Sequence, residues 1–242
     1  MNWLTGRVIL ITGGASGLGR EIALQSGALG AKVAILDTHP QRLEDTKADV
    51  SKTEAGDCLA MRVDITDEEQ VAGAIRETVS KYGQLDTVVN SAGVYWKGPI
   101  VDTPMKEFDR VYNVNVRGLY LVCREAAKVM LPRKSGHIIN ISSIAGERGI
   151  LEESVYSSSK WAVRGIGACL ALELGPENIR VSTVYPGGMD TTFWENDPRR
   201  SSGQWNPSRM LQGKDVATAV VNLANLPEQV AIKDVLVYRA GT

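Results

Sequence analysis

Segments typical of buried strands alternate with segments typical of amphipathic helices along nearly the whole chain. Strand patterns occur near residues 7–12, 32–37, 58–63, 86–90, 137–142, 179–185 and 234–238. Helix patterns occur between them, near residues 17–29, 40–53, 67–82, 104–131, 154–175 and 214–225. This alternation predicts an α/β fold, in which helices cover both faces of a doubly wound parallel sheet of about seven strands.

The length of the chain favours one folded unit. A chain of 242 residues can bury a single large core, and we expect one domain over residues 1–242. The chain is 43% hydrophobic and 23% charged, which is ordinary for a globular protein, and its formal net charge is −1. No block of basic residues suggests nucleic acid, and no apolar run approaches the length of a membrane span.

The first strand is followed at once by a glycine-rich turn and a helix. Gly13 permits a sharp turn, Gly17 lets a phosphate approach the backbone, and Gly19 lets the helix pack closely on the strand. Free N–H groups at the start of the helix, next to Ser16 and Leu18, attract phosphates. The order strand, turn, helix predicts a dinucleotide site, although a purely structural turn is the alternative.

The second strand ends in an acid, Asp37, 18 residues after Gly19. An acid at about this distance bonds the adenine ribose in dinucleotide-binding folds. A carboxylate accepts from both ribose hydroxyls of NAD and repels the extra phosphate of NADP, so Asp37 predicts NAD. A helix cap or turn residue is the alternative interpretation.

Tyr156 and Lys160 are four residues apart and share one face of a predicted helix. An ammonium about 4 Å from a phenol can favour the phenolate by about 4 kcal/mol, which lowers the tyrosine pKa from about 10 towards 7. Such a tyrosine can act as a general acid or base. Taken alone, the pair is also compatible with an amphipathic helix and a solvated lysine.

The glycine pattern TGxxxGxG and the pair YxxxK together resemble the short-chain dehydrogenase/reductase family, of the single-domain kind of about 250 residues. The resemblance runs from about Arg7 to the C-terminus, and five further segments follow the order of the family's motifs. Ser91 stands where the family has a second asparagine, which is a mild departure. The segments are Asp64–Asp67, Asn90–Gly93, Asn113–Val116, Ile141–Ser143 and Pro186–Thr191.

The resemblance implies hydride transfer between a nicotinamide cofactor and an alcohol/carbonyl pair. It assigns catalysis to Asn115, Ser143, Tyr156 and Lys160, with Ser143 holding the substrate oxygen 13 residues before Tyr156. Side chains alternate along a strand, so Ser142 should point away from the cleft. The residues implied for cofactor binding are Gly13, Ser16, Gly17, Leu18, Gly19, Asp37, Asp64, Ile65, Asn90, Ala92, Gly93, Tyr156, Lys160, Pro186, Gly187 and Thr191.

A long segment rich in glycine, proline and serine, residues 187–213, lies on the expected substrate side. Long loops of this kind are usually functional or mobile, and we expect a substrate lid. Phe193, Trp194 and Trp205 would form one apolar wall, and Tyr95 and Trp96 would face it. A disordered surface loop is the alternative.

Other features bear on compartment, metals and assembly. The first strand pattern starts near Arg7, which leaves little room for a signal peptide, and we expect a cytoplasmic protein. Cys58, Cys123 and Cys169 are expected to be buried free thiols, and two histidines without a ligand cluster predict no metal site. Helices 104–131 and 154–175 carry apolar side chains. In the family the corresponding helices pair between subunits, which implies a homotetramer, or failing that a dimer.

The favoured hypothesis is an NAD(H)-dependent short-chain alcohol dehydrogenase or carbonyl reductase. Its substrate would be a secondary alcohol or ketone of medium size, apolar or mixed in character. A 3-oxoacyl-[acyl-carrier-protein] reductase is the enzyme alternative, although such enzymes usually prefer NADPH. A non-catalytic dinucleotide-binding redox sensor is a further alternative, which the complete set of four catalytic residues disfavours.

Overall fold

The fold is built on seven parallel strands in the spatial order β3-β2-β1-β4-β5-β6-β9. The computed structural model describes residues 2–194 and 206–241. The strands are β1 (Val8–Thr12), β2 (Lys32–Asp37), β3 (Cys58–Arg62), β4 (Thr87–Asn90), β5 (Gly136–Ile141), β6 (Ile179–Pro186) and β9 (Asp234–Val237). The predicted α/β class and the doubly wound parallel sheet are therefore confirmed.

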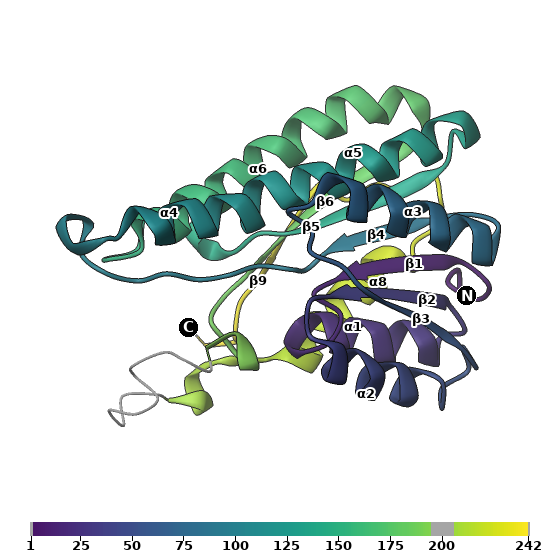
Figure 1. Ribbon diagram of the computed structural model, residues 1–242, viewed down its shortest axis with the longest axis horizontal. Coiled ribbons are helices and arrows are strands. Elements are labelled where there is room, and N and C mark those ends of the chain that lie inside the picture. Colours follow the sequence, from purple (N-terminus) through teal and green to yellow (C-terminus); the bar gives the residue numbers. More distant parts are fainter. Residues whose placement is uncertain (1, 195–205, 242) are drawn as a thin grey trace.

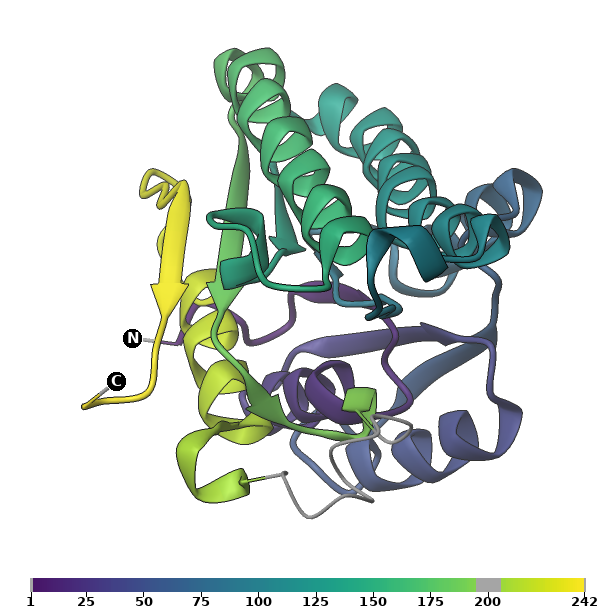
Figure 2. The ribbon, with the colours of Figure 1, turned by 90° about the vertical axis from the view of Figure 1, so that its left-hand side faces the viewer.

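Helices cover both faces of this sheet (Figure 1 and Figure 2). One face carries α1 (Gly17–Ala28), α2 (Pro40–Val50) and α8 (Gly213–Ala224). The opposite face carries α3 (Glu68–Tyr82), α4 (Met105–Tyr112), α5 (Leu119–Met130) and α6 (Ser154–Leu174). The order of the strands reverses on the two sides of β1, and open α/β sheets bind ligands at such a switch point.

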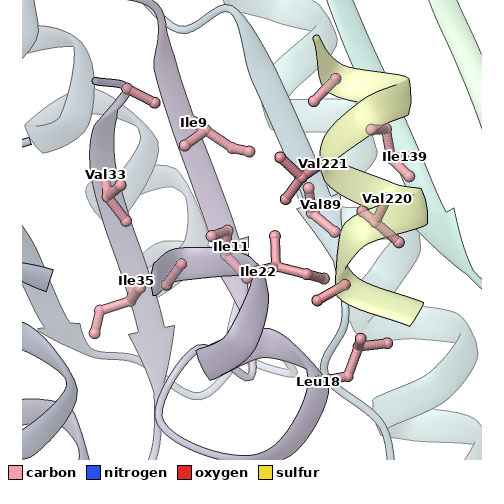
Figure 3. Packing of buried hydrophobic residues seen from close by; sticks show 14 of the residues in the cluster. Ile9, Ile11, Leu18, Ile22, Val33, Ile35, Val89, Ile139, Val220 and Val221 are labelled. Atoms are coloured by element: carbon pink, nitrogen blue, oxygen red, sulfur yellow. The ribbon is translucent and has the colours of Figure 1, made fainter. Parts of the chain in front are cut away.

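The central strand β1 shows why the sheet is hydrophobic on both sides. All five of its residues are buried, as expected for a strand that helices cover on both faces. Ile9 and Ile11 belong to the core under α1 and α8, where Ile22 and Val220 meet them (Figure 3). Val8 and Leu10 point to the other face and belong to the core under α3, α5 and α6.

The single long helix expected over residues 104–131 contains a π-helical segment, Asn113–Gly118, between α4 and α5. Such segments insert an extra residue into a helical turn and are frequent at functional sites. Asn115 lies in this segment and is buried. Gly118, its last residue, packs against Ile65, and a Cβ atom at Gly118 would lie 2.8 Å from the Ile65 side chain.

The segment over residues 187–213 has more structure than the simple loop that was expected. Two short strands, β7 (Met189–Asp190) and β8 (Leu211–Gln212), pair in parallel and bring the two ends of the segment together. Strands of two residues are too short to leave a periodic pattern in the sequence, which is why the sequence did not predict them. Trp205 lies outside the described residues.

The burial of the cysteines and of α5 differs in part from what the sequence predicts. Cys58 and Cys123 are buried as expected, but Cys169 is exposed, because it lies on the outer face of α6. Of the apolar side chains on the helix that the resemblance pairs between subunits, Leu119, Leu121 and Val122 are buried in the chain's own core. Within the described residues, no helix combines the length and the apolar character that crossing a membrane requires.

Gly19→Ala is expected to destabilise the protein by at least about 2 kcal/mol, because the new Cβ atom would lie 2.2 Å from the carbonyl oxygen of Gly13. Gly73→Ala is the matched control in α3, where the nearest atom is the end of the Arg76 side chain at 3.9 Å. That change should stabilise the protein by about 1 kcal/mol through helix propensity. Urea denaturation measures both, and equal effects would contradict the close packing at Gly19.

Candidate active site

The glycine turn between β1 and α1 approaches the next strand connection closely. Gly13 and Gly17 have positive φ angles of 66° and 51°, which favour glycine. A Cβ atom at Gly13 would lie 2.8 Å from the Cα atom of Ala92, so the turn needs glycine for space as well. The N-cap of α1, Ser16, makes no capping hydrogen bond with its side chain. The first turn of α1 therefore offers N–H groups to an anionic ligand.

Asp37 lies at the end of β2 beside this turn. Its two carboxylate oxygens accept hydrogen bonds from the backbone N–H groups of Ala15, at 3.2 Å, and His39, at 3.1 Å. The carboxylate is thus fixed next to the residues that precede Gly17. This position fits a contact with the ribose next to a bound diphosphate.

A cleft of about 610 Å³ opens at the start of α1. Ser16, Gly17 and Arg42 line one side of it, and Thr191 and Lys214 line the other. Its volume is in the range of small-molecule sites. The cleft joins the glycine turn to the segment that follows β6, so both ends of the sequence contribute to it.

Tyr156 and Lys160 are one turn apart on α6 and both are buried, with 6% and 5% of their surfaces exposed. The ammonium of Lys160 donates to the carbonyl oxygen of Ile141 at 3.0 Å and lies 5.7 Å from the centre of the Tyr156 ring. A solvated lysine on an amphipathic helix, the alternative that the sequence left open, is therefore wrong.

The two serines that follow β5 point in different directions, as alternation along a strand predicts. Ser143 hydrogen-bonds with Tyr156 and accepts from the backbone N–H of Ala145 at 3.1 Å. Ser142 is turned away and donates to the carbonyl oxygen of Lys160 at 3.0 Å. Ser143 therefore lies beside the phenol of Tyr156, where a substrate oxygen could meet both hydroxyl groups.

The pKa values of the pair differ from the simple expectation. Burial raises the pKa of Tyr156 above its usual value, the hydrogen bond from Ser143 opposes this, and the charge of Glu153 adds to it. Burial also lowers the pKa of Lys160 to about 8. Desolvation disfavours the charged form of each group, so the pKa of Tyr156 is raised and not lowered towards 7 as the spacing predicted.

Asn115 is held in the π-helical segment by a two-point contact with the backbone of Val94. Its side-chain oxygen accepts from the Val94 N–H at 2.8 Å, and its side-chain nitrogen donates to the Val94 carbonyl at 2.9 Å. The same nitrogen also lies 3.1 Å from the hydroxyl of Ser159 on α6. Asn115 therefore joins the connection after β4 to α6, the helix that carries Tyr156 and Lys160.

The residues after β4 lie around this contact. Asn90 is buried and donates to Asn140 at 2.9 Å, so its side chain supports the sheet. The N–H of Ala92 donates to the hydroxyl of Thr12 at the end of β1. A Cβ atom at Gly93 would lie 3.4 Å from Asn115 and 3.7 Å from the ammonium of Lys160. Gly93 thus leaves space in front of the buried lysine.

The remaining candidate cofactor residues differ in their surroundings. Asp64 is exposed and accepts from Thr66, whereas the side chain of Ile65 is buried in the core. Pro186 ends β6, and the N–H of Gly187 donates to the carbonyl of Val237 at 2.9 Å. Leu18 is part of α1, and its side chain is buried in the core. Thr191 packs against Gly17, at 3.7 Å from the place where a Cβ atom would be.

Four aromatic rings form a cluster at the substrate side. Tyr95 contacts Tyr156 edge-on, with ring centres 5.0 Å apart, and contacts Trp194 at 4.5 Å. Phe193 lies 6.1 Å from both tyrosine rings. Tyr95 and Phe193 therefore contact the Tyr156 ring, and Trp194, a third expected lining residue, contacts both of them. Trp96 is not among these ring contacts, and its indole N–H is buried without a hydrogen-bond partner.

The structure also places Glu153, the residue before α6, close to Tyr156. Glu153 is only 6% exposed, and it accepts a hydrogen bond from the hydroxyl of Tyr95 at 2.6 Å. A signal existed in the sequence, because a residue three positions before Tyr156 shares its helix face. The burial of Glu153, however, depends on Tyr95, which lies in the connection after β4 and is distant in the sequence.

Similarity to known proteins agrees with this geometry. The family model of the short chain dehydrogenases matches residues 7–201. The chain belongs to the short-chain dehydrogenase family. Over 244 residues it is 40% identical to (+)-borneol dehydrogenase 2 of Salvia officinalis. This alignment covers 92% of the present chain and 84% of the plant protein. Its fold matches the crystal structure of levodione reductase with a TM-score of 0.89 and 33% identity, over 97% of both chains.

Two further members of the family with solved structures differ in their cofactor. An NAD⁺-bound xylitol dehydrogenase has a TM-score of 0.87 and 26% identity, over 97% of this chain and 98% of the other. ElxO with NADP bound has a TM-score of 0.86 and 28% identity, over 98% of both chains. Membership of the family thus leaves the choice between the two dinucleotides to individual residues.

Asn115→Ala is expected to lower the free energy of unfolding by about 2–4 kcal/mol, because it leaves the N–H and the carbonyl of Val94 without their partner. Asn113→Ala is the matched control, since Asn113 is exposed in the same segment and should change the stability by less than about 0.5 kcal/mol. Chemical denaturation followed by tryptophan fluorescence measures both variants. A similar loss in the two would contradict the role of the Val94 contact.

Proposed function

We propose that this protein is an NAD(H)-dependent alcohol dehydrogenase or carbonyl reductase. The observation that carries the proposal is the meeting of Ser143, Tyr156 and Lys160 at the same sheet edge as the glycine turn at Gly13–Gly19. Ser143 and Tyr156 present two hydroxyl groups to one substrate oxygen. Membership of an oxidoreductase family supports the reaction class.

The residues at the sheet edge fit a nicotinamide dinucleotide. The uncapped start of α1 suits the diphosphate, and the space in front of Gly93 lies next to Lys160 and Tyr156. Thr191, which packs against Gly17, suits the amide of the nicotinamide. The bound cofactor would supply or accept the hydride. Asp37 supports NAD, because a carboxylate beside the ribose repels the phosphate that distinguishes NADP.

The chain's own part in the reaction is to hold the substrate oxygen and to move a proton. Burial favours the protonated form of Tyr156, which is the form that donates to a carbonyl oxygen during reduction. Ser143 bonds the same oxygen and stabilises the negative charge that develops there. Lys160, fixed by Ile141, contributes a donor and, when protonated, a positive charge that assists the reverse reaction.

The aromatic cluster supports a secondary alcohol or ketone of medium size with apolar or mixed character. Tyr95 and Phe193 pack against the ring of Tyr156, Trp194 packs against Tyr95, and in this proposal the three present apolar surface to the substrate. The similarity to a borneol dehydrogenase and to a levodione reductase points in the same direction. The segment over residues 187–213 acts as the substrate lid in this proposal, with its ends joined by β7 and β8.

The proposed enzyme is a cytoplasmic homotetramer. Exposed apolar side chains occur on two separate faces, which is what a tetramer with two kinds of interface requires. Tyr120, Trp161 and Leu172 are exposed on α5 and α6, and Leu236 and Tyr238 are exposed at the edge strand β9 and just beyond it. The exposed free thiol of Cys169 supports a reducing compartment.

Tyr156→Phe tests the proposed reaction. It should lower kcat by about 10²–10⁴-fold, because the phenol is the proton donor and acceptor, and leave the affinity for NADH nearly unchanged. Tyr82→Phe is the control, since it removes a phenol that bonds the carbonyl of Val33 on the far side of the fold. NADH formation with secondary alcohols and NADH fluorescence measure the two effects. Full turnover by the Tyr156 variant would refute the mechanism.

Asp37→Asn tests the choice of cofactor. The change removes the charge but keeps an oxygen acceptor beside Ala15 and His39, and it should lower the preference for NAD over NADP by at least about tenfold in kcat/KM. Glu44→Gln removes an exposed charge from α2, where Glu44 pairs with Lys47, and should leave the preference unchanged. An unaltered preference in the Asp37 variant would remove its ribose role.

A further inference from the structure

The short segment that follows β7 lies across the edge of the sheet where the candidate cofactor residues meet. The hydroxyl oxygen of Thr192 is 3.4 Å from the position that a Cβ atom of Gly17 would take at the start of α1. The ring carbon Cε2 of Phe193, the next residue, is 3.8 Å from the corresponding position at Gly93 after β4. Figure 2 shows the chain after β6 running across the start of α1. Two consecutive residues therefore contact both glycine turns.

The ring of Phe193 is held by other aromatic rings. Its centre lies 6.1 Å from the ring centres of Tyr95 and Tyr156 and 5.0 Å from that of Trp194. Tilted and edge-on contacts of this kind stabilise aromatic pairs beyond the effect of their buried area. Only 36% of the surface of Phe193 is exposed. The ring is therefore packed into the site and does not extend into solvent.

The position of this ring coincides with the space in front of Gly93. A Cβ atom at Gly93 would lie 3.7 Å from the ammonium nitrogen of Lys160 and 3.8 Å from the ring of Phe193, so both side chains border one small volume. The proposed function assigns this volume to the nicotinamide end of the cofactor. Atoms in protein sites pack at contact distance, and two groups cannot share the same volume. The ring must therefore leave before that end of the cofactor can enter.

The segment that carries Phe193 is anchored just before the ring. Strand β7 pairs with β8, and the methyl group of Thr191 lies 3.2 Å from the position that a Cβ atom of Gly213 would take. Phe193 is two residues beyond this anchor, and its backbone N–H donates to the hydroxyl of Thr191 at 3.3 Å. Hinges of a few residues at the end of an element absorb such movements. A rotation after Thr191 therefore withdraws the ring and leaves the strand pair in place.

We propose that Phe193 is an intramolecular competitor for the nicotinamide end of the cofactor. Before the cofactor binds, its ring fills the space between Gly93 and Tyr156. The entering cofactor displaces the ring, which then becomes part of the apolar wall that meets the substrate. The inference rests on the proposed function and adds to it an opposition to binding that acts on the nicotinamide end and not on the adenosine diphosphate end.

The test compares the binding of NADH and of ADP by isothermal titration calorimetry. ADP shares the adenosine and the diphosphate with NADH but lacks the second ribose and the nicotinamide. Phe193→Ala should lower the Kd for NADH at least about fivefold, because a site that is open in only a fraction of the molecules binds more weakly by that fraction. The Kd for ADP should change by less than about twofold, since ADP does not reach the ring.

Two further variants separate the ring from the fold. Phe193→Leu keeps a smaller apolar side chain at the same place and should increase the affinity for NADH less than Phe193→Ala does. Phe108→Ala is the matched control. It truncates the other of the two phenylalanines, which stacks on Tyr112 in α4 with ring centres 4.5 Å apart, and should leave both Kd values unchanged. Thermal unfolding shows whether each variant is folded, and Phe193→Leu provides the reading if Phe193→Ala is not.

The outcomes distinguish the inference from the proposed function. An unchanged or weaker affinity for NADH in the Phe193 variants overturns the competitor role and leaves the proposed function intact. An equal gain for ADP, or the same gain in Phe108→Ala, also overturns it. If the NADH affinity rises as expected but the wild-type protein turns over no secondary alcohol or ketone, the competitor role holds and the proposed reaction is refuted. If no variant binds NADH, both are refuted.

Discussion

The arrangement of the site depends on two hydrogen bonds that join Lys160 to the end of β5. The ammonium of Lys160 donates to the carbonyl of Ile141, and the hydroxyl of Ser142 donates to the backbone carbonyl of Lys160. Together they fix α6 in height and rotation against the sheet. Because Ser143 follows Ser142 directly and Tyr156 precedes Lys160 by one turn, the same two bonds bring the serine and tyrosine hydroxyl groups together.

Burial of this lysine has an energetic cost that explains the polar surroundings. Desolvation lowers the pKa of Lys160 to about 8 and raises the pKa of Tyr156, so the charged form of each group is less favoured than in water. Asn115 extends the network from the other side by joining Val94 to Ser159 on α6. Helix α6 is thus held by polar contacts from the connections after β4 and β5, and a small movement of either would change the positions of the Ser143 and Tyr156 hydroxyl groups.

The sequence predicted the parts that depend on local pattern. The seven strands, the glycine turn and the spacing of Ser143, Tyr156 and Lys160 are set by periodicity and by short motifs, and the structure contains them as expected. The π-helical segment around Asn115 was not predicted, because its side-chain pattern hardly differs from that of an α-helix. The exposure of Cys169 and the burial of Glu153 were also beyond the sequence, since both depend on which distant segment covers the helix face.

The two halves of the site differ in what determines them. The half next to the glycine turn depends on backbone conformation and on the absence of side chains at Gly13, Gly19 and Gly93. Atoms added there would meet the backbone, or at Gly93 the side chains of Asn115 and Lys160. Such constraints follow from the fold. The other half depends on side chains that hold one another, through the bond of Tyr95 to Glu153 and the ring contacts of Phe193 and Trp194. Substitutions at these side chains would leave the sheet unaltered. In this fold the sheet edge therefore sets where the reaction takes place, and the segments that cover this edge determine which substrate fits.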